Sequence, residues 1–291
     1  EIAAQLELDA HRLESFLHVA AYLGVVEKRE GRFSLFEGDA PFFDPASPFG
    51  AGLPKLSMTR MFAVRGRAAE LLRGAPHNEA AGSGGDAGPE AREEFIRYID
   101  AISHDGAAEL AALLPEMPVR ATMDLGGGGG TYTHAVLGRF GGARGLIVDR
   151  PDAEPTIRAL ATERGFAARI DFAAIDFVEE PLPGDKDVII LSNVVHCYSP
   201  EINAGLVAAI ARSLSPGGVG AIKDYIVDAE HTGPASALRF AVTMAVNSEG
   251  GGVYSADEVG AWCVQAGLEV VGAHEMVKAE GSYTVVARRG A

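Results

Sequence analysis

From Arg120 onward, short apolar runs alternate with stretches in which apolar residues recur at helical spacing. This alternation is typical of a parallel sheet covered by helices on both faces, because parallel strands need long crossover connections. It predicts strands at 121–125, 145–148, 170–174, 187–191 and 219–226, with helices starting near Thr131, Ala153 and Pro200. After a helix at 256–266, strands at 268–274 and 282–287 are joined by a link short enough to demand antiparallel pairing. The prediction is a doubly wound α/β sheet that ends in an antiparallel hairpin.

The N-terminal part has a different pattern. Apolar residues recur at helical spacing between Asp9, a candidate N-cap, and Gly24, a candidate stop. A short β-rich pair around Gly31 follows, so helix and hairpin together predict a winged helix. From Asp9 to Glu37 the chain holds five acidic and four basic residues, which is not a DNA-binding face. Helical spacing returns at 90–114 and indicates helices that connect the two parts.

The charge of the chain narrows the classes of partner. The 291 residues include 25 Lys and Arg against 40 Asp and Glu, for a formal net charge of −15. Nucleic-acid binders need basic side chains to neutralise phosphates, so we exclude nucleic acid as a partner. No run of about 18 apolar residues occurs, and we therefore expect a cytoplasmic protein that makes no membrane contact. The sequence starts at Glu1, already in helical pattern, so an N-terminal piece is expected to precede it.

A glycine-rich loop after the first predicted strand of the sheet carries the most specific signal. From Asp124 to Thr131 it reads Asp-Leu-Gly-Gly-Gly-Gly-Gly-Thr. Glycines at a strand-to-helix junction let the backbone approach a ligand at the carboxyl edge of the sheet. The dinucleotide pattern G-x-G-x-x-G fails in every frame, whereas Gly126, Gly128 and Gly130 form G-x-G-x-G. Asp124 beside this loop would be unfavourable near a pyrophosphate and suits a ligand that ends in an ammonium group.

Acidic and aromatic residues end the next two predicted strands. Asp149 comes 19 residues after the last glycine, where an acid can bind both hydroxyls of a ribose. Asp176 and Phe177 end the third strand, where a carboxylate and an aromatic face can hold an adenine. Each signal alone is also explained by turns, caps and core packing. Their occurrence at successive strand ends indicates an adenosyl ligand.

The same residues carry a resemblance to a known enzyme family. It rests on D-L-G-G-G-G-G at 124–130, V-D-R-P at 148–151, I-D-F at 175–177, L-S-N-V-V-H at 191–196 and L-S-P-G-G at 214–218. These motifs resemble those of S-adenosylmethionine (SAM)-dependent O-methyltransferases of the caffeic acid and hydroxyindole type, over essentially the whole chain. The resemblance implies a Rossmann-like class I methyltransferase domain at 115–291. It also implies a mainly α winged-helix dimerisation domain with connecting helices at 1–114, and hence a homodimer.

The resemblance and the residue pattern together assign two sites. The residues expected to bind SAM, or its product S-adenosylhomocysteine (SAH), are Asp124, Gly126, Gly128, Gly130, Asp149, Arg150, Asp176, Phe177, Ser192 and Asn193. The acceptor, expected to be a small aromatic or polyketide-like secondary metabolite, would contact Phe95, Tyr98, His104, Phe240, Met244 and Asn247. For the aromatic residues and Met244, burial in the core explains the pattern equally well.

The reacting end is expected at His196, which closes the fourth predicted strand and matches the general base of the resembled family. Asp224, 28 residues later at the end of the fifth strand, matches the acid that orients this base. The chain departs from the family at four positions: Cys197 and Tyr198 replace Asp-Trp, Ser192 replaces a basic residue, and Val253 lies where a second supporting acid would be. These departures weaken the assignment of phenol deprotonation and leave cofactor binding untouched.

Other functions remain open at this point. The same fold can methylate carbon or nitrogen, where positioning matters more than a base, and a non-methylating relative can retain SAM. A winged-helix regulator that senses a small ligand is disfavoured by the acidic N-terminal part. No metal is expected, because the candidate ligands His104, His196 and Asp224 show no short ligand spacing. Cys197 and Cys263 fit free thiols in a reducing compartment.

Overall fold

The computed structural model describes residues 2–22, 24, 26–36, 70, 73, 88–248, 250–279 and 281–290. Contacts divide the chain into two compact units, Glu1–Leu53 and Pro54–Ala291. Within the described ranges, every helix is too short or too polar to cross a membrane.

The first unit contains a helix followed by a hairpin. After the short α1 (Ile2–Gln5), helix α2 (Ala10–Tyr22) is capped by Asp9, whose Oδ1 accepts a hydrogen bond from Arg12 N at 2.9 Å. Strands β1 (Glu27–Arg29) and β2 (Arg32–Ser34) pair antiparallel, and Gly31 has a φ of 77° in the turn. The predicted cap, helix and hairpin are confirmed, while the segment 37–69 lies outside the described residues.

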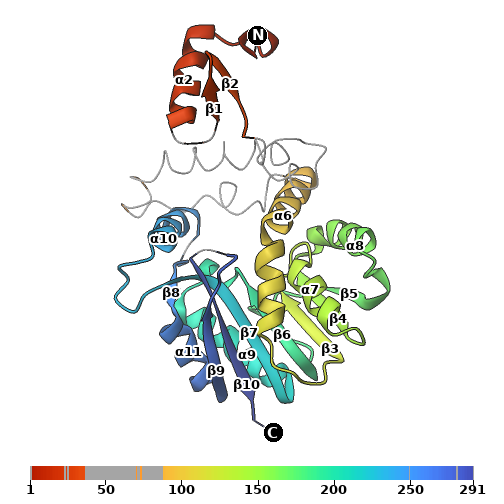
Figure 1. Ribbon diagram of the computed structural model, residues 1–291. Helices are drawn as coiled ribbons and strands as arrows, with labels where there is room; N and C mark the ends of the chain where they lie inside the picture. Colours follow the sequence, from red (N-terminus) through yellow and green to blue (C-terminus); the bar gives the residue numbers. More distant parts are fainter. Residues whose placement is uncertain are drawn as a thin grey trace. The chain divides into compact units, whose positions relative to one another are not determined.

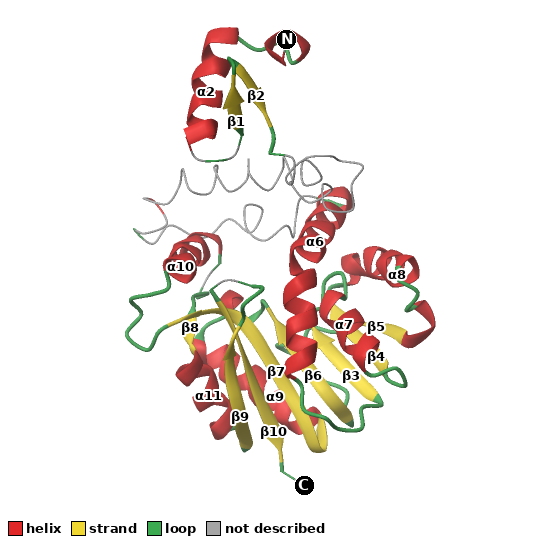
Figure 2. Cartoon of the chain, in the orientation of Figure 1, coloured by secondary structure: helices red, strands yellow, loops and turns green. Residues whose placement is uncertain are grey.

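The second unit is built on one large sheet (Figure 1), with strand order β5-β4-β3-β6-β7-β10-β9 and β8 paired to β7. Its strands are β3 (Ala121–Leu125), β4 (Arg144–Asp149), β5 (Ile170–Ala174), β6 (Lys186–Ser192), β7 (Leu214–Val227), β8 (Tyr254–Ser255), β9 (Leu268–Glu275) and β10 (Ser282–Arg289). Strands β3 to β7 pair parallel, whereas β10 is antiparallel to both β7 and β9. The predicted parallel sheet with an antiparallel C-terminal hairpin is confirmed (Figure 2).

Helices cover both faces of this sheet. They are α6 (Pro89–Leu113), α7 (Thr131–Arg139), α8 (Glu154–Glu163), α9 (Pro200–Ser213), α10 (Ala235–Asn247) and α11 (Ala256–Gln265). Side chains of α6, α7 and α8 join one apolar cluster, and those of α9 and α11 join another. Successive side chains of β6 point to opposite faces of the sheet and so contribute to both clusters: Ile190 packs in the first, and Ile189 and Leu191 pack in the second.

Helix α6 belongs to the core of the second unit. Its Ile96, Ala107 and Leu110 are at most 2% exposed and pack in the same cluster as residues of the sheet. The division between compact units therefore falls between Leu53 and Pro54, not at residue 114 as the sequence suggested. Helical periodicity shows that α6 has an apolar face but not which element covers it. A dimerisation role for 1–114 remains a prediction.

The strand order positions the functional residues. The chain leaves β3 toward β4 and β5 on one side and returns to β6 and β7 on the other. The carboxyl ends of β3 and β6 therefore flank the point where the strand order reverses, which is where open α/β sheets bind ligands. The glycine loop follows β3 directly, and His196 follows β6 by a few residues.

Candidate active site

The glycine loop has the backbone conformation that its sequence predicts. Gly126, Gly128 and Gly130 have φ angles of 66°, 52° and 75°, which residues with a Cβ rarely adopt. A Cβ on Gly130 would come within 2.7 Å of Ile147, and one on Gly126 within 2.9 Å of Val194. A Cβ on Gly128 would meet no atom within 4 Å. The loop is therefore packed tightly at its ends and open at its middle, which fits a backbone cradle for a ligand.

Asp149 ends β4 beside this loop and is 6% exposed. Its Oδ2 accepts a hydrogen bond from Gly128 N at 2.8 Å, and its Oδ1 accepts from Arg150 N at 2.7 Å and from Arg92 Nη2 at 3.1 Å. A carboxylate has about four acceptor sites, so capacity remains for a ribose hydroxyl. Arg92 of α6 was missed by sequence reasoning, because its contact spans 57 residues and no local motif marks it.

Asp124 lies in β3 under the loop and is 1% exposed. Its Oδ2 accepts a hydrogen bond from Thr133 Oγ1 at 2.8 Å, and a Cβ on Gly127 would come within 2.9 Å of its Cγ. Burial raises the pKa of Asp124 to about 7. A ligand ammonium nearby would lower this pKa again, because an opposite charge favours the ionised carboxylate.

Phe177 lies next to the loop, whereas Asp176 makes a local turn. A Cβ on Gly126 would lie 3.7 Å from the Phe177 ring. The Phe177 ring also packs edge-on against the Tyr198 ring, with the two ring centroids 6.4 Å apart. Asp176 is exposed, and its Oδ1 accepts a hydrogen bond from Val178 N at 3.0 Å. The aromatic face is thus near the loop, as an adenine site requires, while adenine recognition by Asp176 remains a prediction.

Ser192 and Asn193 lie at the end of β6, beside β7. Ser192 is in register with Lys223, and its buried Oγ has no hydrogen-bond partner among the described residues. Asn193 has a positive φ of 56°; its N donates to the Lys223 carbonyl and its Oδ1 accepts from Lys223 Nζ, each at 2.8 Å. Lys223 therefore brings an ammonium from the neighbouring strand to the level of Ser192, which sequence reasoning did not foresee.

His196 and Asp224 are brought together at the edge of the sheet. His196 lies in a 3₁₀ turn, Val195–Cys197, and its Nδ1 is 2.7 Å from Asp224 Oδ1. Asp224 Oδ2 also accepts a hydrogen bond from His196 N at 3.2 Å. Because the carboxylate accepts at Nδ1, that nitrogen carries a proton, and in the neutral imidazole Nε2 is therefore the acceptor. The geometry suits a base oriented by an acid.

Two opposing effects set the pKa of His196. Burial lowers it, but the charge and hydrogen bond of Asp224 outweigh burial and raise the pKa to about 10, with a smaller contribution from Cys197. The imidazolium is therefore the favoured form at neutral pH. Once deprotonated, the imidazole is a stronger base than an ordinary histidine.

The glycines just before Val253, the position where the resemblance implies a second supporting acid, lie against the main chain of His196. Gly252 N donates a hydrogen bond to the His196 carbonyl at 3.0 Å. A Cβ on Gly251 would come within 2.5 Å of the same carbonyl oxygen. The chain at 251–252 can therefore approach the main chain of His196 closely enough for this hydrogen bond only because residue 251 has no side chain.

Aromatic side chains surround the His196 imidazole. Phe240 of α10 contacts it edge-on with ring centroids 4.8 Å apart, and Tyr225 lies against Phe240 at 4.3 Å. Burial, Asp224 and, to the smallest extent, Tyr98 of α6 raise the pKa of Tyr225. The other acceptor candidates are the half-buried Phe95 and Met244, and Asn247, whose side chain lies outside the described part.

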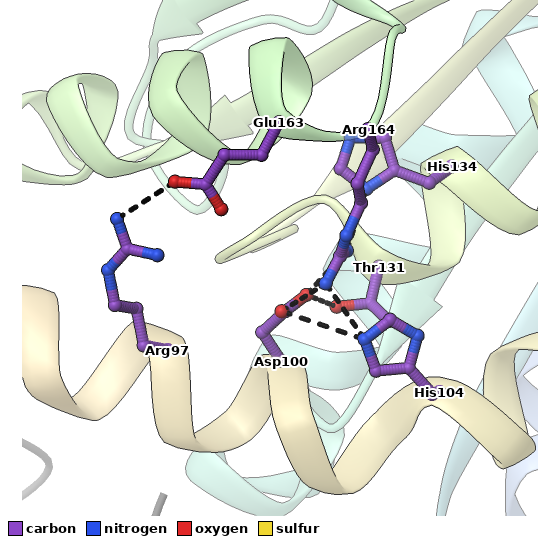
Figure 3. A network of polar contacts seen from close by, with 7 residues as sticks. All are labelled: Arg97, Asp100, His104, Thr131, His134, Glu163 and Arg164. Atoms are coloured by element: carbon purple, nitrogen blue, oxygen red, sulfur yellow. Dashed lines mark hydrogen bonds and ion pairs between the residues drawn. The ribbon is translucent and has the colours of Figure 1, made fainter. Parts of the chain in front are cut away.

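His104 lies in a different place from the other acceptor candidates. Figure 3 shows it in a polar network between α6 and the start of α7. Asp100 accepts hydrogen bonds from Thr131 Oγ1 and from Arg164 Nη1, the latter at 2.7 Å, and His104 Nε2 is 2.8 Å from Arg164 Nη2. Six positions rotate an α-helix by about 600°, so Tyr98 and His104 point in different directions. His104 thus belongs to the network beside the glycine loop, and its contact with the acceptor remains a prediction.

Comparisons with known proteins agree with this geometry. Residues 73–269, more than half of the chain, match the O-methyltransferase domain family. The 3-hydroxy-5-methyl-1-naphthoate 3-O-methyltransferase of Streptomyces sahachiroi is 30% identical over 282 residues, covering 93% of this chain and 79% of that protein. The tetracenomycin polyketide synthesis 8-O-methyltransferase of Streptomyces glaucescens is 28% identical over 274 residues, covering 92% of this chain and 80% of that protein.

A solved structure shows the same fold. PigF with SAH superposes with a TM-score of 0.82 at 24% identity, over 99% of this chain and 88% of that chain. The strand order, the glycine loop and the family match point the same way. This chain belongs to the O-methyltransferase domain family and is a SAM-dependent methyltransferase.

Proposed function

We propose that this enzyme transfers the methyl group of SAM to a hydroxyl of a small aromatic or polyketide-like metabolite, with His196 as the general base. The observation that carries this proposal is the 2.7 Å contact between His196 Nδ1 and Asp224 Oδ1 at the ligand-binding edge of the sheet. The acceptor class is supported by the relatives named for a naphthoate and for a tetracenomycin polyketide.

The residues around the glycine loop would hold the cofactor. Gly126, Gly128 and Gly130 offer the cradle, Asp149 the ribose contact and Phe177 a face for the adenine. SAM, when bound, supplies a methyl group that its sulfonium already activates. Orientation of two reactants can contribute about 7–11 kcal/mol in well-oriented systems, so holding the acceptor in line is the main task of the protein.

His196 and Asp224 act on the acceptor hydroxyl. His196 Nε2 takes the proton of the acceptor hydroxyl, and the Asp224 carboxylate stabilises the imidazolium that results. Because the pKa of His196 is raised to about 10, most of the free enzyme holds the imidazolium at neutral pH. Deprotonation before the acceptor binds, or entry of the acceptor as its anion, gives the same outcome: kcat/KM rises with pH.

Calorimetric titration with SAM and SAH, with NADH as a control, tests the cofactor part of the proposal. Micromolar binding of the two adenosyl ligands alone is the expected result. Incubation with SAM and a set of phenols and naphthols then tests the transfer, with one SAH released for each methyl ether formed. A folded protein that binds neither adenosyl ligand would refute the proposal.

Asp149→Asn should weaken SAH binding about 10- to 100-fold, the range for a hydrogen bond to a charged group. The amide keeps the shape of the side chain but loses the charge that accepts ribose hydroxyls. Asp152→Asn is the matched control, since Asp152 Oδ1 lies 3.9 Å from Arg92 Nε and 3.4 Å from Arg150 Nε but is one third exposed. Equal SAH affinity in both variants, measured by calorimetry, would remove Asp149 from the ribose role.

Methyl transfer to nitrogen or carbon is the second candidate. Such a reaction depends on positioning more than on a base. The apolar Val253 stands where the resemblance implies a second acid to support His196, which is compatible with a weaker demand for proton transfer. Full activity of a His196→Ala variant would favour this candidate.

We further propose a cytoplasmic homodimer assembled through the first unit. Large apolar side chains of this unit are exposed: Leu6 by 61%, Phe16 by 70%, Val19 by 56% and Tyr22 by 89%. Exposed apolar clusters commonly mark protein interfaces. Light scattering should give twice the mass of one chain, and Phe16→Asp should shift it toward one chain. Val277→Asp, at a position 82% exposed in the second unit, should leave the mass unchanged.

A further inference from the structure

Lys223 is a buried ammonium one residue before Asp224 in β7. It is 4% exposed, and its hydrogen-bond partner among the described residues is Asn193 Oδ1, at 2.8 Å from Nζ. An ammonium carries three N–H donors and no acceptor, so one amide oxygen satisfies it only in part. A buried charge is normally paired with an opposite charge, because desolvation is costly.

Asp224, the acid whose charge acts on Lys223, already accepts other hydrogen bonds. The charge of Asp224 reaches Lys223, but the two Asp224 oxygens accept hydrogen bonds from His196 Nδ1, His196 N and Tyr225 N. With a protonated His196, this pair is neutral overall and does not compensate the ammonium. Burial accordingly lowers the pKa of Lys223 to about 8, which leaves most of it charged at neutral pH.

Lys223 and His196 contact different members of an aromatic wall formed by Tyr225 and Phe240. Lys223 Nζ is 5.4 Å from the Tyr225 ring centroid, Tyr225 lies against Phe240, and Phe240 contacts His196. The Tyr225 and Phe240 rings are inclined by 33° to each other, whereas Phe240 meets the imidazole at 88°. A planar ring lying along this wall would have a base at one end and an ammonium at the other.

We propose that Lys223 binds a carboxylate on the methyl acceptor and thereby selects hydroxyaryl carboxylates. The carboxylate would supply the opposite charge that the ammonium lacks, while the hydroxyl at the other end of the ring faces His196. This inference rests on the proposed function, because it takes His196 as the reacting end. It narrows the acceptor class to aromatic compounds that carry an anionic group.

Three probes test the proposal: 2-naphthol, 3-hydroxy-2-naphthoate and 6-hydroxy-2-naphthoate, which share one hydroxyl and differ in the carboxylate. Each is titrated calorimetrically into the dimer saturated with SAH, and each is assayed for methyl transfer with SAM. The wild type should bind at least one naphthoate ten times or more tightly than 2-naphthol, because truncating a buried charge pair has a large effect on affinity. The preference should fade above the pH at which Lys223 loses its proton.

Substitutions at Lys223 separate charge from structure. Lys223→Met and Lys223→Gln should each reduce the naphthoate-to-naphthol affinity ratio to within about threefold of one, whereas Lys223→Arg should retain a preference. The glutamine keeps a donor for Asn193 Oδ1, so it reports on charge if the methionine variant fails to fold. Lys186→Met is the control: Lys186 lies at the start of β6, whereas Lys223 pairs with Ser192 at its end, so the naphthoate-to-naphthol affinity ratio should not change. SAH affinity should be the same in Lys223→Gln, Lys223→Arg and Lys186→Met, which keep a donor for Asn193 Oδ1.

Each outcome decides the inference separately from the proposed function. Equal wild-type affinity for all three probes, absence of binding by both naphthoates, or an unchanged ratio in Lys223→Gln would overturn it. Methylation of 2-naphthol as efficient as that of the naphthoates would also overturn it while leaving O-methylation intact. A naphthoate preference that depends on Lys223, without any methyl transfer, would uphold the binding site and refute the proposed function.

Discussion

Replacing His196 with alanine is expected to lower kcat by about 10²- to 10⁴-fold, the usual contribution of a positioned base. SAH should bind nearly as before, because the structure places His196 with Asp224 and Phe240 and not in the glycine loop. The remaining rate would come from holding the acceptor in line. Measuring SAH release and SAH binding on the same preparation gives both quantities.

The pH dependence provides a second readout of the same pair. Asp224 raises the pKa of His196 to about 10 against the lowering effect of burial, so kcat/KM of the wild type should climb with pH toward that region. Asp224→Asn removes the charge but leaves the imidazole buried. The pKa of His196 then falls, so the rise of kcat/KM with pH moves to lower pH. The maximum rate should also drop, because the imidazolium loses the carboxylate that stabilises it.

A second histidine–acid pair supplies the control. His231 Nε2 lies 3.2 Å from Glu258 Oε2, but the two side chains are 48% and 43% exposed. His231→Ala should leave kcat, KM and the pH profile within about twofold, because solvent screens such a pair. A His196→Ala enzyme with full kcat, or a pH profile that Asp224→Asn does not move, would exclude His196 as the base.

The sheet was predictable because each strand is a compact apolar run. The expected ranges 121–125 and 170–174 coincide with β3 and β5. Strand β7 begins earlier than expected, at Leu214, which pairs with Lys186 before a register shift. Pro and Gly residues at 216–218 indicate a turn from local sequence, and only the neighbouring strand shows that the chain there already lies in the sheet.

The candidate site was predictable where its residues follow from strand ends. Gly126, Gly128, Gly130 and Asp149 are in this class, because a strand-to-helix junction alone specifies their place. Contacts between distant segments were not predictable: Arg92 with Asp149 spans 57 residues, and Asn193 with Lys223 spans 30. No local pattern marks such partners.

Helix α6 joins the two halves of the candidate site. Its Tyr98 acts electrostatically on Tyr225, and its Arg92 and Asp100 form hydrogen bonds with Asp149 and Thr131. A Cβ on Gly129 would come within 3.1 Å of the Asp100 side chain, so the helix lies directly on the glycine loop. The predicted cofactor and acceptor sites would therefore share this helix, and its anchoring on the loop should matter for both.

Replacing Asp100 with asparagine is expected to lower the free energy of unfolding of the second unit by about 3–5 kcal/mol, the cost of breaking a buried ion pair. The Asp100 side chain is 6% exposed and that of Arg164 is 21% exposed. The variant leaves the guanidinium beside His104 and His134 without its carboxylate (Figure 3). Urea unfolding at pH 7 measures the loss. Weaker SAH binding should accompany it, because a neutral amide oxygen accepts the hydrogen bond from Thr131 less strongly than the carboxylate does.

Glu163→Gln is the matched control, because Arg97 and Glu163 also join α6 to α8, at 3.3 Å, but Glu163 is 53% exposed. That change should lower the free energy of unfolding by less than about 1 kcal/mol.

Burial raises the pKa of Asp100, but hydrogen bonds from His104, Arg164 and Thr131 outweigh burial and hold the pKa at about 2. The stabilisation is therefore complete above the ordinary carboxyl pKa of about 4 and is lost as the pH falls toward 2. The difference in unfolding free energy between the wild type and Asp100→Asn should therefore decrease as the pH falls from about 5 to about 3. If the two proteins have the same unfolding free energy at pH 7, this network does not hold α6 on the glycine loop.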